Sequence, residues 1–462
     1  MKIVFKRTNF GAALLGSLLC TVILFLVTLY HDGGQLHGES ALFFINYLDG
    51  RPLLKQIFDP LHNDWGCYQA RELSYFFDAL DARFIAFLLK NRIIWFHSFC
   101  SLLCCGAMIF IQQYFSRRFF PRIPGMLITL VSLFFVLAAP VSGLDYFRCA
   151  KYLTALGLWG AFFSGYGAFR WKSPKGKVCF ILSLLLMTLS DRQGFFFTAA
   201  ICGTSALLLF CLSRMETEVL ARRMRFLLFS SFGVVCFGIL NNLYITPQII
   251  RHLNNYAPDF SYQRDISVAP LHLKEGFLFL TGNIGSWFNN FTGDYRTATL
   301  TGILLTGGIV LELYRRYRRS ERSGILLAVS WGTMLLAMLV CSVIMVARLS
   351  IIMEADFFYG IYTVTFMVVV LWLLTLTAEG GGKKFCRILL IFFTVALLLR
   401  LGGELATDKF LPEINIKNGW KTRQHILKES LRDPGFDETK HCLPHRMELF
   451  LEFYRKKVLT KQ

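Results

Sequence analysis

The sequence begins with a basic segment and the apolar run GAALLGSLLCTVILFLVTLY, residues 11–30, which leads directly into HDGGQLHGE, residues 31–39. The run has the roughly 20 apolar residues that an α-helix needs to cross a bilayer. Lys2, Lys6 and Arg7 precede it, and no small-residue cleavage motif follows it. We therefore interpret the run as a retained first membrane span rather than as a signal peptide.

The composition of the whole chain indicates an all-α polytopic membrane protein. Of its 462 residues, 55% are hydrophobic and only 17% are charged. Apolar runs of span length recur along most of the chain, so we expect about 11 transmembrane helices. The expected spans are residues 10–30, 93–115, 124–144, 152–170, 178–190, 195–213, 226–245, 297–314, 324–346, 357–377 and 387–402.

The charged residues gather in alternate loops, and this pattern predicts the topology. The net charge is +19, and the basic residues cluster between apolar runs, where they set orientation and meet anionic membrane lipids rather than nucleic acid. The acidic loops carry Asp145, Asp191, Asp259, Asp265, Glu354 and Asp356. Under the positive-inside rule the N-terminus is cytoplasmic, and the acidic loops and the C-terminus are outside. We expect a multi-pass protein of a bacterial inner (cytoplasmic) membrane.

The chain is divided into a transmembrane module at residues 1–402, which contains a large outer first loop at 31–92, and a small outer C-terminal tail at 403–462. The apolar segment 277–291 contains three asparagines. If it crossed the membrane, the basic run 315–322 would lie outside, so we expect an interfacial or re-entrant element there.

Two short apolar segments are joined by only Asp191-Arg192-Gln193-Gly194. They form either a tight helical hairpin whose turn needs a glycine, or one broken helix that lines a cavity. Basic loops flank the pair on both sides, and this favours the hairpin.

The outer first loop carries candidate catalytic acids, the first of them where the first span ends. Asp32 is placed at the interface, where partial desolvation makes a carboxylate a better base. The alternative is that His31 and Asp32 only cap the helix. His31, Asp32, His37 and Glu39 could also hold a divalent cation, although their spacing matches no established ligand pattern. The 13 cysteines lack metal-ligand spacing as well.

Further along the loop, the stretch from Asp64 to Phe84 predicts an amphipathic helix lying in the membrane interface. Asp78 and Arg71 fall on its polar face, and Asp81 follows Asp78 at i+3. We expect a functional role for Asp64, Arg71 and Asp78 together, and surface ion pairs for Asp81 and Arg83. The apolar stripe contains Leu73, Phe76, Phe77, Leu80, Phe84, Phe87 and Leu88.

Cations at the outer ends of the spans are candidates for binding phosphate. They are Arg148, Lys151, Arg192 and Arg348. An arginine near the bilayer needs a partner, which is either a neighbouring acid or a lipid phosphate that the guanidinium grips with two hydrogen bonds.

This arrangement resembles the GT-C glycosyltransferases, polytopic enzymes that take sugars from polyprenyl-phosphate carriers. The resemblance is one of topology over nearly the whole chain. In addition, Asp32 has the place of an acid that is often essential in that superfamily, and Ser190 to Gly194 is similar to a short outer turn of the mannosyltransferase-like branch. The chain lacks an Asp-Glu pair after the first span, an Asp-x-Asp motif in the loop and a Trp-Trp-Asp motif.

The resemblance implies an enzyme that moves a sugar from a lipid-linked donor to a glycan, lipid or protein acceptor on the outer face. Asp32 or Asp64 would take the proton of the acceptor hydroxyl, and Arg192, Arg348 and Arg148 or Lys151 would neutralise the departing phosphate. The alternatives are a transporter or flippase for a lipid-linked or anionic substrate, a polysaccharide polymerase or ligase, and a structural assembly factor. The absence of an internal repeat and the placement of the charges at span ends disfavour a transporter.

Overall fold

The computed structural model describes residues 7–31, 38–59, 71–91, 97–119, 124–138, 149–215, 218–255, 272–289, 295–318, 322–349, 391 and 394–395. These residues form helices joined by short links, and none of them lies in a β-strand. The all-α prediction is therefore confirmed for the described part of the chain. Two expected spans, 357–377 and 387–402, fall essentially outside the described residues, as does the tail 403–462.

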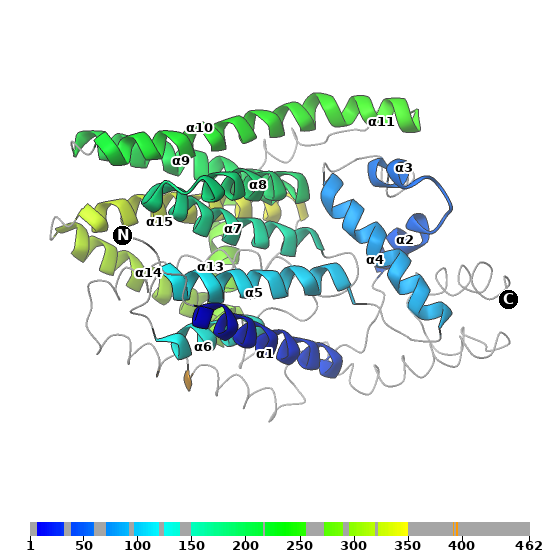
Figure 1. Ribbon diagram of the computed structural model, residues 1–462, viewed down its shortest axis with the longest axis horizontal. Coiled ribbons are helices and arrows are strands. Elements are labelled where there is room, and N and C mark those ends of the chain that lie inside the picture. Colours follow the sequence, from blue (N-terminus) through cyan, green and yellow to red (C-terminus); the bar gives the residue numbers. More distant parts are fainter. Residues whose placement is uncertain are drawn as a thin grey trace.

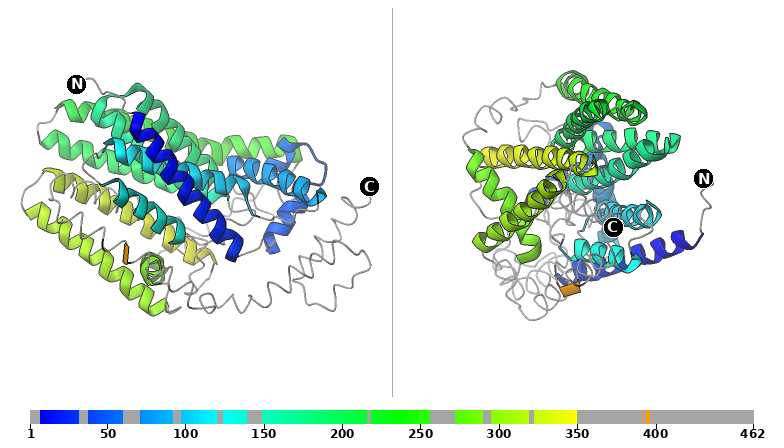
Figure 2. Two further views of the ribbon diagram at one scale, coloured as in Figure 1. Left: turned by 60° about the horizontal axis from the view of Figure 1, so that its bottom comes forward. Right: turned by 90° about the vertical axis from the view of Figure 1, so that its left-hand side faces the viewer.

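Most of the helices run side by side as one bundle, with their long axes close to the horizontal of Figure 1. The two other views show the same bundle from the side and from one end (Figure 2). Its main helices are α1 (Arg7–His31), α5 (Phe99–Phe119), α6 (Gly125–Ala138), α7 (Cys149–Trp171), α8 (Pro174–Ser190), α9 (Arg192–Arg214), α10 (Glu218–Leu240), α14 (Tyr295–Arg318) and α15 (Arg322–Leu349). Each overlaps a span expected from the apolar runs.

Four helical stretches in the described ranges are long and apolar enough to cross a membrane: Phe99–Phe119, Arg192–Arg214, Glu218–Asn254 and Arg296–Arg315. Shorter apolar stretches lie at Phe10–Ile23 and Ala328–Ile344. Many large apolar side chains on the outside of the bundle are exposed, among them Leu15, Phe229 and Leu304. This apolar surface suits a lipid environment better than water.

The first loop folds into three helices at one end of the bundle: α2 (Gly38–Tyr47), α3 (Leu53–Phe58) and α4 (Glu72–Lys90). Figure 1 shows them together at the right of the view, with α4 inclined to the bundle axis. The buried amide of Gln56 holds them together. Its Nε2 donates to Tyr47 O at 3.1 Å, and its Oε1 accepts from Arg83 Nη2 at 2.8 Å.

The polar face of α4 points inward, and much of its apolar stripe points outward. Tyr75, Asp78 and Asp81 are buried, whereas Phe84 is 38% exposed and Phe87 is 61% exposed. In water, a helix would be expected to bury its aromatic residues and to expose its charged residues. An interface helix that rests its aromatic residues in lipid and its polar face on protein explains the observed arrangement.

The two short segments around residue 191 form a hairpin, and this confirms the favoured alternative. Asp191 alone separates α8 from α9, and the hydroxyls of Thr188 and Thr198 meet at 3.1 Å across the two helices. A Cβ on Gly194 would lie 2.0 Å from Met187 O. A glycine is needed here because the two helices approach closely.

The doubtful segment 277–291 lies largely within the helix α13 (Leu273–Asn289), which packs against α14 and α15. Its contact with α14 is very close, because a Cβ on Gly285 would lie 1.7 Å from Ala298 O. Asn283 and Thr281 are buried, and both bond to carbonyls of their own helix. At 17 residues the helix is shorter than a usual span.

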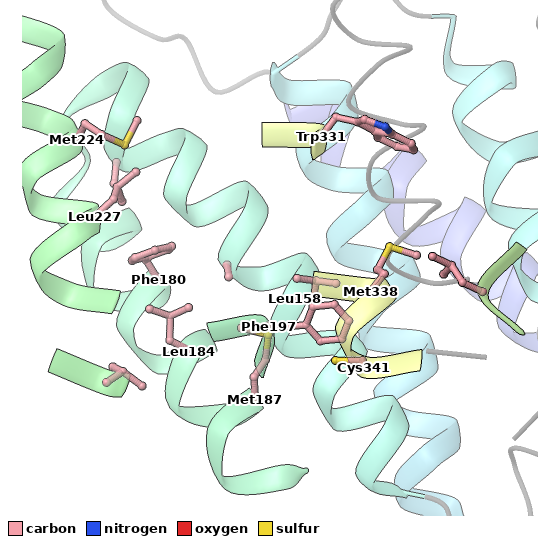
Figure 3. Packing of buried hydrophobic residues seen from close by; sticks show 14 of the residues in the cluster. Leu158, Phe180, Leu184, Met187, Phe197, Met224, Leu227, Trp331, Met338 and Cys341 are labelled. Atoms are coloured by element: carbon pink, nitrogen blue, oxygen red, sulfur yellow. The ribbon is translucent and has the colours of Figure 1, made fainter. Parts of the chain in front are cut away.

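One apolar core joins α7, α8, α9, α10, α13, α14 and α15. Figure 3 shows its centre, where Leu158, Phe180, Leu184, Met187 and Phe197 gather between neighbouring helices. This core packs α7, α8 and α9 against one another, and α4 contacts α7 and α8.

The basic residues of the bundle gather at the end remote from α4. Helices α5, α7 and α9 begin at the α4 end of the bundle and run to the far end, and basic residues lie at or just after their last turns (Figure 1). Helix α5 begins beside Asp81 of α4, and α9 begins directly after Asp191. The cations at the far end include Arg117, Arg118, Lys172, Lys175, Lys177 and Arg214.

Candidate functional site

Asp78 is a buried acid on the inward face of α4. Its exposed fraction is 1%, and its Oδ2 accepts a hydrogen bond from Ser74 Oγ at 3.3 Å. Burial raises the pKa of this carboxyl well above its usual value, and the nearby charge of Asp81 raises it further. The Ser74 hydroxyl, the Arg71 cation and the backbone amide of Cys149 oppose that rise. Asp78 Oδ1 has no well-formed hydrogen bond within the described residues.

Asp81 joins α4 to the start of α5. Its Oδ2 accepts from Ser98 Oγ, and its Oδ1 accepts from the backbone N–H of Cys100 at 3.0 Å. Burial raises its pKa to about 6, while these hydrogen bonds limit the rise. The expectation of a surface ion pair at Asp81 is wrong, because this residue is buried and caps a helix.

Arg83 does not form the expected surface ion pair within the described residues either. Its Nη1 donates to Ala79 O at 2.8 Å, and its Nη2 donates to Gln56. Arg83 thus ties α4 to α3 through neutral acceptors, which suits a guanidinium that is half withdrawn from water.

Lys151 and Asp191 form a buried ion pair between α7 and the start of α9. Lys151 Nζ, in the first turn of α7, donates to Asp191 Oδ2 at 2.7 Å, and the side chains are 12% and 3% exposed. Burial alone would raise the pKa of Asp191, but the Lys151 and Arg71 cations lower it to about 2. Asp191 Oδ1 also accepts from Gln193 N at 3.3 Å and so caps α9.

The charge of Arg71 acts on both Asp78 and Asp191. Arg71 is the residue that precedes α4, and its cation is close enough to lower the pKa of both Asp78 and Asp191. Another candidate cation, Arg192, directly follows Asp191 in the sequence and is the first residue of α9. Arg71 therefore links the buried Asp78 on α4 to the Lys151–Asp191 pair, although these residues come from three separate parts of the chain.

Four of the candidate residues have no described side chain. Asp32, Asp64 and Arg148 lie outside the described residues, and Arg348 lies near the end of α15 with only its backbone described. Of the suggested cation ligands around Asp32, His37 lies outside the described residues as well, and only the backbone of His31 and Glu39 is described. Within the described ranges, His, Cys, Asp and Glu form no group of three that is suited to a metal ion.

Sequence reasoning overlooked Glu72. This residue begins α4, is largely buried, and accepts hydrogen bonds from Thr246 and Asn241 of a helix remote in sequence. No spacing rule links residues about 170 positions apart. The available signal was an acid at the first position of a predicted amphipathic helix, where the helix dipole favours it.

The arrangement places the buried carboxyl of Asp78, whose pKa is raised, within the field of Arg71, and the same cation acts on the Lys151–Asp191 ion pair. A carboxylate of raised pKa is suited to accepting a proton, and the cations are suited to holding an anion. Comparison with protein-family models and with curated proteins finds no match for this chain.

Proposed function

We propose that the protein is a glycosyltransferase of GT-C type in a bacterial inner membrane, which moves a sugar from a polyprenyl-phosphate carrier to an acceptor on the outer face. In this proposal the chain crosses the membrane 11 times, with its N-terminus in the cytoplasm and its tail outside. The α4 end of the bundle is then the outer end, and the cation-rich end is cytoplasmic.

The observation that carries the proposal is the position of Arg71, whose charge acts both on the buried Asp78 carboxyl and on Asp191 of the Lys151–Asp191 ion pair. Transfer from a polyprenyl phosphate needs a base for the acceptor hydroxyl and positive charge for the departing phosphate. Both requirements are met within one group of buried side chains. The exposed apolar surface of neighbouring helices gives an isoprenoid tail a place beside the site.

In the proposed reaction the acceptor oxygen forms a bond to the sugar C1 while the bond from C1 to the phosphate oxygen breaks. The hydroxyl proton passes to the ionised Asp78 carboxylate, and the electron pair of the broken bond stays on the phosphate. Lys151 and Arg71 stabilise that developing charge. Because the pKa of Asp78 is raised, transfer increases as the pH rises toward that pKa.

The experiment compares Asp78→Asn with the wild type in inner-membrane vesicles supplied with radiolabelled polyprenyl-phosphate sugars. Asn has the same shape and can still bond to Ser74, so we expect normal expression and a loss of transfer of about 10²–10⁴-fold. Glu218→Gln is the matched control, since Glu218 is an exposed acid at the far end of α10. Transfer by Asp78→Asn at the rate of the control would contradict the assignment.

Asp32 and Asp64 remain alternatives for the base, because the sequence places both acids in the outer first loop. Their Asn variants belong in the same assay. Full activity in both, with loss only in Asp78→Asn, assigns the base to Asp78.

A second candidate is a transporter or flippase for a lipid-linked or anionic substrate. It is favoured by one observation, the buried pair Asp78 and Asp81 one turn apart, because acids of this kind bind and release protons in membrane transporters. Reconstituted vesicles separate the two functions. Movement of the lipid-linked substrate without covalent transfer supports the transporter.

A further inference from the structure

Glu72 is held by two side chains of the longest helix in the described part of the chain. Thr246 Oγ1 donates to Glu72 Oε1, and Asn241 Nδ2 lies 3.5 Å from the same oxygen. Burial raises the pKa of Glu72, and these two donors oppose the rise. The contacts tie the first turn of α4 to the region where α10 continues into α11 (Thr246–Asn254).

The helix changes its winding where it holds Glu72. Residues Asn241–Ile245 form a π-helical turn, in which the backbone N–H of Thr246 donates to Asn241 O. This i→i+5 hydrogen bond brings residues 241 and 246 one above the other. In a regular α-helix they would point about 140° apart, and only one of them would face Glu72.

The sequence gives a local reason for this turn. Pro247 follows Thr246 and has no N–H to offer to the carbonyl of Leu243, and its ring would collide with that carbonyl in a regular α-helix. A widened turn before the proline relieves the collision. Leu243 and Tyr244 of the turn are exposed, so the apolar core does not require the wider turn.

The π-helical turn lies beside the first turn of α4, next to the proposed transfer site. The continuous helix Glu218–Asn254 has 37 residues and is about 55 Å long, against about 30 Å for the hydrocarbon core. Its last part therefore reaches beyond the core and contacts α3. Glu72 and Asp81 then hold α4 at two points, against α10–α11 and against α5.

We propose that Glu72 is a positioning residue, which the π-helical turn Asn241–Ile245 clamps so that Arg71 and Asp78 stay in place at the proposed transfer site. The inference rests on the proposed function for the site that it names. Arg71 is directly adjacent to Glu72, and Asp78 lies within the next two turns of the same helix. Loss of the contacts of Glu72 with Thr246 and Asn241 therefore displaces the guanidinium of Arg71 before it affects Asp78.

A purely structural acid would be expected to satisfy both of its oxygens. Glu72 Oε2 is buried and has no hydrogen-bond partner within the described part of the chain. A buried acceptor left unpaired costs about 1–3 kcal/mol. Retention of a carboxyl at such a cost is typical of a functional region.

The test uses the full chain in lipid nanodiscs and two readouts. The first is hydrogen exchange of the backbone amides of residues 75–79, which reports local opening of α4. The second is the affinity for polyprenyl monophosphate. We expect Glu72→Ala and Thr246→Val each to raise the exchange at least tenfold and to weaken the affinity at least fivefold.

The conservative variants Glu72→Gln and Thr246→Ser keep an acceptor and a donor, so both readouts stay within twofold of the wild type. Leu313→Ala is the control for general destabilisation, because Leu313 is buried in α14 away from Glu72. We expect Leu313→Ala to keep the affinity for polyprenyl monophosphate within twofold of the wild type.

Unchanged exchange at residues 75–79 in Glu72→Ala, or an equal rise in Leu313→Ala, would overturn the inference. Failure of the wild type to bind polyprenyl monophosphate would count against the proposed function instead. In that case the exchange measurement still decides whether Glu72 positions α4.

Discussion

At the scale of single residues, the Lys151–Asp191 pair shows how charge is kept inside the bundle. Both side chains are largely withdrawn from water, so each ion depends on the other for its solvation. Arg71 adds a second cation near Asp191. While Asp78 is protonated, these two cations outnumber the one charged acid, Asp191, and a substrate phosphate would supply the missing negative charge.

Replacing Lys151 with Met is expected to lower the free energy of unfolding by about 3 kcal/mol, because it leaves Asp191 charged and buried. Adding Asp191→Asn is expected to restore most of the loss, since the amide is neutral and can still cap α9. Denaturant unfolding in detergent measures both. Lys90→Met, at an exposed lysine of α4, is the control. Equal stability of Lys151→Met and the control would refute the buried pair.

Asp81 is expected to make stability fall as the pH rises. Its pKa is about 6 in the folded chain and 3.8 in the reference state, so between those values the unfolded chain releases a proton that the folded chain keeps. The wild type therefore loses about 3 kcal/mol across that window, and Asp81→Asn does not. Unfolding at pH 4.0 and pH 6.5 compares them. A difference between the two proteins that stays constant with pH would contradict the raised pKa.

At the scale of elements, α13 and α14 show helix association through close backbone contact. A Cβ on Gly302 would lie 1.8 Å from Thr281 O, and one on Gly285 would lie 1.7 Å from Ala298 O. Small residues let the backbones of membrane helices approach in this way.

Gly302→Ala is expected to destabilise the protein by about 2 kcal/mol, because the two helices must separate to admit the methyl group. In Gly307→Ala, on the same helix, the added methyl group has no atom within 4 Å. This substitution should stabilise α14 by up to about 1 kcal/mol, because alanine favours a helix more than glycine does. Thermal unfolding in detergent distinguishes them. A stabilising effect of both substitutions would mean that the close contact is absent.

The elements themselves could be predicted from sequence, but the way they pack could not. Apolar runs located nine bundle helices within the described ranges and the break at Asp191. The stripe of α4 was found correctly, yet periodicity does not say which side meets protein and which meets lipid, and so Asp81 was misassigned. The Glu72–Thr246 contact depends on the tertiary arrangement and on a π-helical turn, for which no periodic pattern exists.

At the scale of the whole molecule, charge is divided between the two ends of the bundle. Buried acids and their partner cations gather under α4, and exposed cations such as Lys175 and Arg222 gather at the opposite end. This division agrees with an outer site and a cytoplasmic face that meets anionic lipid. It also gives two competing places for a lipid phosphate to bind, one at each end.

The most direct measurement is photo-crosslinking of the purified protein in nanodiscs with a polyprenyl monophosphate that carries a diazirine next to the phosphate. We predict labelling of the first turns of α4, the start of α7 and the α8–α9 turn, reduced at least fivefold in Lys151→Met and in Arg71→Met. Labelling confined to the cation-rich end around Arg222, or unchanged in both variants, would contradict a phosphate site under α4.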